Sequence, residues 1–363
     1  MKLLPWILVL CLLYLSPVQA QQRTLKGTVV DKETRDALPG ANVFINQTTI
    51  GVSTSSTGGF VLNNLPVGKQ TVVVSMIGFK TFSYPLDELL ALGDRVIIEL
   101  EPDPILLDQI QVTAKKPRRW LRNLEIFKEQ FLGITDNAKQ TIILNPEVID
   151  FENQGNDLFA TARAPLEIEN RALGYHIQFH LEQFLFNKEG LISSIYTDGY
   201  SVYKELESEN DQEKQNWLDE RNRAYKGSFT HFIHALFADQ LKPEGFLVYF
   251  DKRLRVNNGG RSPEVERTRS IYSFTKELNE IKLKNSKTDF LRVQYINERA
   301  EEAVAEVINI PAQFSWISFP NEYAIVDIKT GKEPTAFRSK LHGYWGMSHR
   351  IADLLPSNYR TAL

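Results

Sequence analysis

The sequence predicts an N-terminal all-β sandwich followed by a larger C-terminal α+β domain with a mainly antiparallel sheet and two or three helices. Three observations lead to this expectation. Short β-rich runs separated by turn residues fill residues 21–101. Apolar and polar side chains alternate along residues 175–186, as in a half-buried strand, and an apolar stripe at helical spacing follows Ser228. Apolar residues make up 42% and charged residues 24% of the chain, which is ordinary for folded domains.

Residues 1–20 have the pattern of a secretory signal peptide. Lys2 precedes an almost wholly apolar run, and small residues at Val18 and Ala20 mark a cleavage point. The run is shorter than the roughly 20 residues that a membrane-spanning helix needs. We therefore expect an exported protein in the periplasm or at the periplasmic face of the outer membrane, in preference to a fully secreted one.

Cys11 is the only cysteine, and it lies inside the apolar run of the signal. A lipid-acceptor cysteine would instead follow a small residue at the end of that run, so we expect neither lipid attachment nor a disulfide in the mature chain. Hydrophobic cores must then provide the stability. The formal net charge of −3 argues against nucleic acid as a partner.

Residues 21–101 predict a small antiparallel sandwich, because short strands recur at regular spacing with turn chemistry between them. Gly40, Gly58, Gly68 and Gly78 lie where the chain reverses or a strand ends, and glycine tolerates the positive φ of such turns. The expected strands cover residues 24–30, 41–46, 50–54, 60–65, 70–77 and 96–100.

Five blocks of this region, in order, resemble the carboxypeptidase regulatory-like domain over residues 22–101. They are 25–31, 38–43, 57–60, 65–68 and 75–79. The resemblance implies a transthyretin-like, that is prealbumin-like, fold. It implies no activity, because this domain is an accessory module in envelope proteins of Bacteroidetes-type bacteria. Residues 107–114 resemble the segment that leads to the plug of TonB-dependent receptors, but the chain that remains is too short for a plug and barrel.

Residues 102–134 are expected to form a linker and an amphipathic helix that stops at Gly133. A basic amphipathic helix could make peripheral contact with an anionic membrane. Glu125 and Glu129 interrupt the basic face, which favours a connecting helix packed on the C-terminal domain. The residues that would make the membrane contact are Lys115, Lys116, Arg118, Arg119 and Trp120.

Residues 135–363 are expected to form the C-terminal domain. Its clearest feature is a β-hairpin of residues 175–186 and 191–203. A charged helix over 205–223 and an apolar-striped helix over 228–241, capped by Ser228, should follow. The remaining expected strands are 166–169, 246–250, 270–274, 290–295, 314–318 and 323–328. This region resembles uncharacterised envelope proteins that carry the same N-terminal module.

No zinc-peptidase motif is present, since no histidine has a glutamate three residues later. His231 and His234 lie three apart on the expected helix and could share a metal, or they could be the polar edge of that helix. His176 and His180 would share one strand face about 13 Å apart, too far to chelate one ion. We expect no metal and no cofactor.

Other catalytic motifs are also absent, including Gly-x-Ser-x-Gly and the phosphate-binding loop. Tyr344 and Trp345, between two glycines, could stack on a sugar or peptide, or could seal the C-terminal core. These two residues and the pair His231 and His234 are the candidate ligand contacts.

The leading hypothesis is a non-enzymatic binding or scaffolding factor of the cell envelope, with an envelope protein or glycan as partner. One alternative is a periplasmic hydrolase whose acids and histidines, among them His176, meet only in three dimensions. The other is a lipid-handling protein, which would need a large apolar cavity under residues 166–328.

Overall fold

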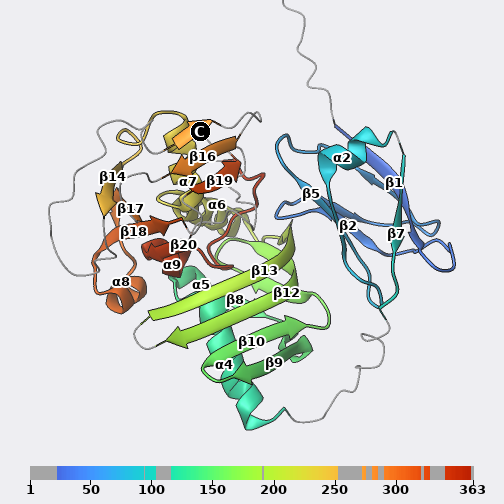
Figure 1. The fold of residues 1–363 in the computed structure, drawn as a ribbon, viewed down its shortest axis with the longest axis horizontal. Coiled ribbons are helices and arrows are strands. Elements are labelled where there is room, and N and C mark those ends of the chain that lie inside the picture. The colour runs from blue at the N-terminus through green and yellow to red at the C-terminus, as the bar shows by residue number, and fades with distance from the viewer. Residues whose placement is uncertain are drawn as a thin grey trace, which may run out of the picture.

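The computed structural model describes residues 23–93, 95–103, 116–189, 192–251, 272–274, 280–284, 290–319, 323–327 and 340–360. The signal-peptide pattern with Cys11, the segment 107–114 and Lys115 lie outside these residues. Figure 1 shows a small β-domain beside a larger part that combines sheets and helices. No helix in the described ranges has the length and apolar composition needed to cross a bilayer.

The N-terminal domain is built from two sheets with one shared core. Alternation along the strands decides what enters this core: Val43 and Ile45 point inward from one strand, and Val72 and Val74 from its neighbour. The first sheet has the order β4 (Gly59–Leu62), β1 (Leu25–Asp31), β7 (Val96–Leu100). The second has the order β3 (Gly51–Ser53), β2 (Asn42–Ile45), β5 (Thr71–Ser75), β6 (Phe82–Pro85).

The domain departs from the expected pattern in two ways. β1 and β7 pair in parallel, whereas the sequence predicted an antiparallel sandwich. Strand β6 and helix α2 (Leu86–Ala91) were not predicted, because β6 is a mostly exposed edge strand and α2 has too few residues to show helical periodicity. Gly58 confirms its expected role, since its φ is 72° and a Cβ there would lie 2.5 Å from the backbone oxygen of Val29.

The first half of the C-terminal part is a six-stranded antiparallel sheet covered on one face by α4 (Arg118–Leu132). The predicted hairpin is its centre: β12 (Tyr175–Glu189) pairs with β13 (Ile192–Glu205) along its length. The first half of β12 also pairs with β11 (Leu166–Asn170), which pairs with β8 (Thr141–Ile143). The second half pairs with β10 (Asp157–Ala162), which pairs with β9 (Ile149–Gln154).

Helix α4 places aromatic side chains directly on the hairpin strand. Its Phe127 packs edge-on against Phe184 at 4.8 Å between ring centroids, and its Phe131 packs against Phe179 at 5.1 Å. Phe127, Phe131 and Phe184 are at most 1% exposed. Tyr175, Ile177, Phe179 and Leu181 face inward as the alternation predicted. Phe184 faces inward only because the strand register shifts between Leu181 and Gln183, which the sequence did not predict.

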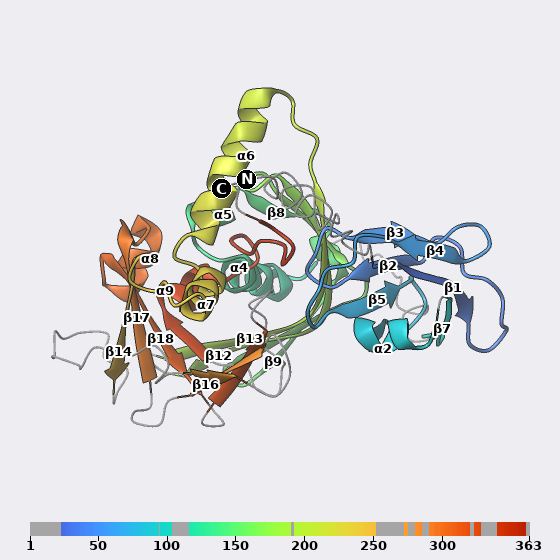
Figure 2. The same cartoon turned by 90° about the horizontal axis from the view of Figure 1, so that it is seen from above.

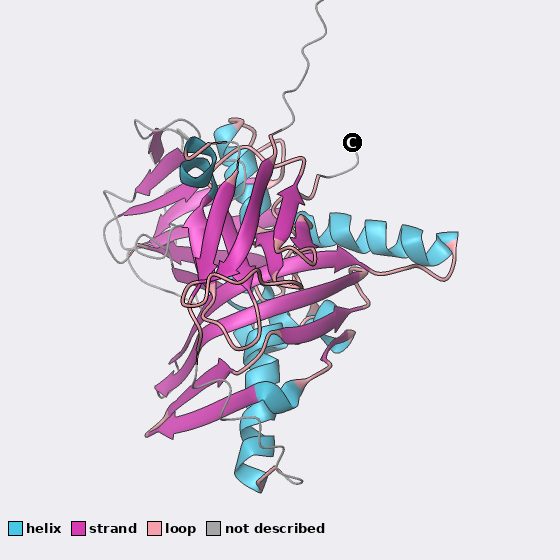
Figure 3. Cartoon of the chain, turned by 90° about the vertical axis from the view of Figure 1, so that its right-hand side faces the viewer, coloured by secondary structure: helices cyan, strands magenta, loops and turns pink. Residues whose placement is uncertain are grey.

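The second half of the C-terminal part packs α7 (Phe229–Phe237) on two further sheets. Ser228 caps α7 as expected, since its side chain accepts a hydrogen bond from the His231 N–H at 3.1 Å. Helix α6 (Asp211–Tyr225) extends away from the sheets (Figures 2 and 3). One sheet has the order β14 (Phe246–Asp251), β17 (Phe290–Arg299), β18 (Ala312–Ser318), β20 (Lys340–Gly343). The other has the order β15 (Tyr272–Phe274), β16 (Glu280–Lys284), β19 (Tyr323–Asp327).

The mixed α+β character of this part is confirmed, but the expected single sheet and two or three helices are wrong. The described residues of 135–363 form three antiparallel sheets and helices α5 to α9, while α4 is the helix expected in the linker segment. The unpredicted helices α5 (Asp136–Lys139), α8 (Glu302–Ile308) and α9 (Tyr344–Ser348) have seven residues or fewer, so they leave almost no periodic signal.

Candidate functional site

The predicted histidines His231 and His234 lie on α7, and both contact Tyr225 at the end of α6. The Tyr225 hydroxyl is 2.8 Å from Nδ1 of His234. Nδ1 of His231 accepts a hydrogen bond from the backbone N–H of Gly227 at 3.1 Å, so its Nε2 carries the proton and faces the Glu244 carboxylate at 3.2 Å. The structure therefore brings the pair together through a tyrosine.

His231 is 6% exposed, and burial lowers its pKa although Glu244 acts in the opposite direction. Both of its ring nitrogens have protein partners, which is how a buried structural histidine is satisfied. Among the described residues, no group of three or more His, Cys, Asp or Glu side chains is arranged to hold a metal ion. Through the His231 ring, Gly227 in the turn between α6 and α7 is connected to Glu244 in the segment before β14.

Tyr344 and Trp345 begin α9 and belong to the core of the second half of the C-terminal part. They are 9% and 3% exposed. The Trp345 indole N–H donates to the Gly227 carbonyl at 2.7 Å, and its ring packs edge-on against Phe229. The two aromatic side chains fill the space between α7 and α9.

His176 and His180 lie on β12, on the face that the alternation predicted to be wetter. His176 is 3.1 Å from the Glu167 carboxylate. His180 differs, because it is 6% exposed and stacks on Phe44 of the N-terminal domain with ring centroids 5.2 Å apart. This burial lowers the pKa of His180 to about 4. The N-terminal domain covers this part of the face.

The N-terminal domain is bonded to the edge of β13 (Figure 2). The turn after β2 runs parallel to this strand, with Thr48 paired to Val202. The Gln47 N–H donates to the Ser201 carbonyl at 2.6 Å, and the Tyr203 N–H donates to the Thr48 carbonyl at 2.9 Å. The turn thus continues the hydrogen-bond ladder of the C-terminal sheet into the sandwich.

Further contacts surround this ladder. Phe44 is 1% exposed but points out of the sandwich core, since its neighbours Val43 and Ile45 point inward. The Tyr200 hydroxyl donates to the Ser83 hydroxyl at 2.9 Å. The C-terminal tail joins the same place, where the Ser357 N–H donates to the Gln47 carbonyl at 2.7 Å. Side chains and backbone from both domains therefore fix the sandwich in one orientation.

A polar and aromatic cluster that the sequence did not reveal lies on the sheet β14-β17-β18-β20. Strand register places it on the face opposite α7, because Val248, Val293 and Ile317 point into the α7 core. We call it the outer-face cluster; its members are Tyr249, Asp251, Phe290, Arg292, Phe314, Trp316, Ser318, Lys340 and His342.

Asp251 is the acidic side chain of this cluster and is 5% exposed. Its Oδ2 accepts a hydrogen bond from the Trp316 indole N–H at 3.0 Å and lies 3.6 Å from Nε of Arg292. Among the described residues, Oδ1 of Asp251 and Nε of Arg292 are buried with no hydrogen-bond partner. The Arg292 guanidinium lies 4.6 Å from the Tyr249 ring centroid and 5.7 Å from that of Phe314.

Ser318 and His342 form a hydrogen-bonded pair in the same cluster. The Ser318 hydroxyl oxygen is 3.0 Å from Nε2 of His342, and Phe290 packs edge-on against the imidazole. Burial lowers the pKa of His342, so the ring is neutral at pH 7 and able to accept a proton. A hydroxyl beside a neutral imidazole is also how a nucleophile and its base are arranged.

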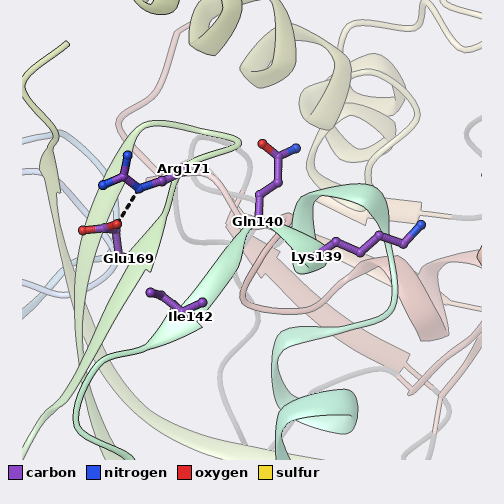
Figure 4. A pocket seen from close by; sticks show the side chains of 5 residues that line it. All are labelled: Lys139, Gln140, Ile142, Glu169 and Arg171. Atoms are coloured by element: carbon purple, nitrogen blue, oxygen red, sulfur yellow. Dashed lines mark hydrogen bonds and ion pairs between the residues drawn. The ribbon is translucent and has the colours of Figure 1, made fainter. Parts of the chain in front are cut away.

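A shallow surface pocket of about 220 Å³ lies at the edge formed by α5, β8 and β11 (Figure 4). Glu169 and Arg171 pair across it at 2.6 Å. The Arg171 side chain is 64% exposed, so the pair is a solvated surface ion pair. Lys139, Gln140 and Ile142 complete the lining.

The basic segment before α4 contacts the C-terminal sheet. The Trp120 indole N–H donates to the Ile149 carbonyl at 2.9 Å, and Arg119 donates to Asn153 at 3.0 Å. Lys116 lies over the Trp120 ring and donates to the Glu147 carbonyl. Trp120 and the two basic residues thus hold the start of α4 against β9.

Residues 25–112 match the CarboxypepD_reg-like domain family, which confirms the resemblance seen in the five sequence blocks. No curated protein matches the sequence. A candidate carbohydrate-binding protein from Bacteroides uniformis aligns at 10% identity over 50% of this chain and 78% of its own, with a TM-score of 0.17. A DUF3823 family protein from Bacteroides ovatus aligns at 11% identity over 52% and 82%, also with a TM-score of 0.17. At these TM-scores the alignments establish neither a shared fold nor a shared ligand.

Proposed function

We propose that this chain, whose residues 25–112 are a CarboxypepD_reg-like domain, is an exported cell-envelope protein that binds a ligand without transforming it. The signal-peptide pattern of residues 1–20 supports export to the periplasm or to the periplasmic face of the outer membrane. The sandwich would act as a fixed part of the binding protein, since its turn after β2 is hydrogen-bonded to β13.

The observation that carries the binding proposal is the carboxylate of Asp251. A buried polar atom normally has a hydrogen-bond partner, and one that lacks it calls for an explanation, of which a bound ion or ligand is one. Here, within the part of the chain that the structure describes, Oδ1 of Asp251 has none. Arg292, which pairs with Asp251, lies between the half-buried rings of Tyr249 and Phe314. Aromatic side chains beside a few fixed polar groups are common in ligand sites.

Cell fractionation of the source organism tests the export proposal. We expect the chain in the periplasmic or outer-membrane fraction, with a mature N-terminus at Gln21 by mass spectrometry. Recovery of an unprocessed chain from the cytoplasm alone would contradict the proposal.

A second candidate function is that of a periplasmic hydrolase, favoured by the 3.0 Å contact between Ser318 and His342. Labelling with a fluorophosphonate probe tests it, because the probe reacts with activated serine hydroxyls. Labelling that disappears in Ser318→Ala would support the hydrolase and overturn the non-enzymatic proposal. A chain that stays unlabelled would favour binding.

The lipid-handling hypothesis finds no support in the first half of the C-terminal part. The face of the six-stranded sheet that would have to enclose a lipid is packed with α4 side chains, among them Phe127 and Phe131. A lipid there would have to displace a core helix.

A further inference from the structure

We infer that the N-terminal end of α4 is a docking surface for a membrane of anionic phospholipids. This surface consists of Lys116, Arg118, Arg119, Leu121 and Arg122, which are exposed or half-buried, and we call it the α4 tip. The inference goes beyond the proposed function, because it concerns the surface on which the chain is held and leaves the bound ligand open. It follows from the shape of the tip, its charge and one apolar side chain.

The α4 tip projects beyond the sheet that the rest of the helix covers. Phe127 and Phe131, farther along α4, are buried on the hairpin strand. Figures 1 and 3 show that the first turns of the helix reach past the six-stranded sheet, at the lower end of the molecule in both views. A projecting end of this kind fits a flat surface better than a small molecule, since small-molecule sites are concave.

The four basic side chains of the tip form no ion pair with the described residues. Arg119 donates to the Asn153 side chain and Lys116 donates to the Glu147 carbonyl, so both of these partners are neutral acceptors. The first turn of α4 contains no acidic residue. The positive charge of the tip is therefore left for a partner outside the described chain.

The acidic residues of β9 do not cancel this charge. Phe151 and Asn153 face α4, since Phe151 packs on its aromatic rings and Asn153 accepts hydrogen bonds from its side chains. Asp150 and Glu152 alternate with them and so point to the opposite side of the sheet.

The acidic residues of α4 itself lie farther along the helix. Glu125 is paired with Lys128. Glu129 comes seven residues after Arg122, which is about 10 Å along the helix axis and close to one Debye length at 0.1 M salt. The tip is therefore a local positive surface, although the whole chain has a formal net charge of −3.

Leu121 favours a lipid bilayer over an acidic protein or a soluble polyanion. Its apolar side chain is 51% exposed and shares a helix face with Arg118 and Arg122. An exposed apolar side chain among cations fits the boundary between headgroups and acyl chains. Arginine side chains suit the same boundary, because their apolar stems can stay among the acyl chains while the guanidinium groups reach the headgroups.

Co-flotation of the mature chain, residues 21–363, with lipid vesicles tests the inference. One set of vesicles contains phosphatidylcholine alone, and the other also contains phosphatidylglycerol as about one third of the lipid. We expect binding to the second set only, and weaker binding as the salt concentration rises. The double variant Arg118→Gln with Arg122→Gln should bind roughly 30-fold more weakly, because each basic residue near an anionic surface contributes about fivefold.

The matched control removes the same charge elsewhere. Lys204→Gln with Lys214→Gln changes two exposed lysines on β13 and α6 and should leave binding unchanged. Because Arg118 and Arg122 are also exposed and form no ion pair with the described residues, their replacement should leave the melting temperature of the chain unchanged. A loss of vesicle binding in that variant then reports the surface itself.

A fluorescent label shows whether position 121 enters the bilayer. The only cysteine, Cys11, precedes residue 21, so Leu121→Cys and Ile97→Cys each give the mature chain one attachment point for an environment-sensitive dye. On the anionic vesicles we expect a blue shift of the dye emission at position 121. We expect none at position 97, where Ile97 is 67% exposed on the sandwich.

Four results would overturn the inference. They are equal binding to both sets of vesicles, equal binding of the parent and the double arginine variant, and an unshifted dye at position 121. The fourth is binding to poly-L-glutamate without binding to either set of vesicles, which would assign the α4 tip to an acidic protein.

Discussion

Replacement of Phe44 by alanine should loosen the sandwich from the C-terminal part without unfolding either. Phe44 is 1% exposed, yet it lies outside the sandwich core and stacks on His180. Burying an aromatic side chain removes about 150–250 Å² from water, worth about 4–6 kcal/mol at 25 cal/mol per Å². If the sandwich separated from the C-terminal part, its own residues would still cover part of the Phe44 ring. We therefore expect Phe44→Ala to weaken the free energy that holds the two parts together by about 2–3 kcal/mol.

That loss corresponds to a roughly 30- to 150-fold larger undocked fraction. Hydrogen exchange measures it directly, because the amides of Gln47 and Tyr203 are bonded across the junction. In Phe44→Ala these two amides should exchange faster by about the same factor, while amides inside β1 keep their protection.

Ile97→Ala is the matched control, since Ile97 is 67% exposed on the other sheet of the sandwich. It should change neither amide. Unchanged exchange at Gln47 and Tyr203 in Phe44→Ala would refute the reasoning, because Phe44 would then contribute nothing to docking. Equal loss of protection throughout the sandwich would refute it as well, by showing that Phe44 stabilises the domain itself.

Three further predictions concern stability. The pKa of His180 falls to about 4 in the folded chain. The free energy of unfolding should therefore decrease by about 3 kcal/mol in total as the pH drops from about 6.5 toward 4. In His180→Phe this decrease should be absent when unfolding by urea is measured over the same pH range. Gly174→Ala should lower the free energy of unfolding by about 2–4 kcal/mol, since its Cβ would lie 2.2 Å from Trp217. Gly155→Ala, at a similar positive φ with open space around it, should lower it by about 1 kcal/mol. Equal losses of stability in thermal unfolding of the two variants would contradict this. Phe127→Ala should cost about 3–5 kcal/mol in denaturant, because its fully buried ring packs on Phe184.

Local patterns in the sequence were sufficient to predict the strands and helices in which apolar residues recur at a regular spacing. The alternation along the first half of β12 predicted both the strand and its buried face, and Ser228 predicted the start of α7. The β9–β10 hairpin around Gly155 was missed, because only the first residue of β9 is fully buried and its pattern resembles a loop. Short helices such as α8 were missed for lack of length.

The candidate site could not be predicted, because it depends on strand pairing. Asp251, Arg292 and Trp316 come from three strands that are distant in the sequence, and only the register brings them together. His180 presents the same difficulty. Its place in an alternating strand predicts a wetter face, and the side chain that covers it, Phe44, belongs to another domain. No local pattern reports a contact of that kind.

The pairing of Thr48 with Val202 has a consequence for self-association. β13 pairs only with β12 among the described strands, so its other side is an open row of N–H and C=O groups. Such an edge recruits strands from other molecules and promotes aggregation. The turn of the sandwich forms hydrogen bonds with this row at Ser201 and Tyr203 and so blocks other strands from pairing there. A chain from which the sandwich has been removed would expose this edge of β13, and the β12–β13 hairpin could then pair with strands of other copies.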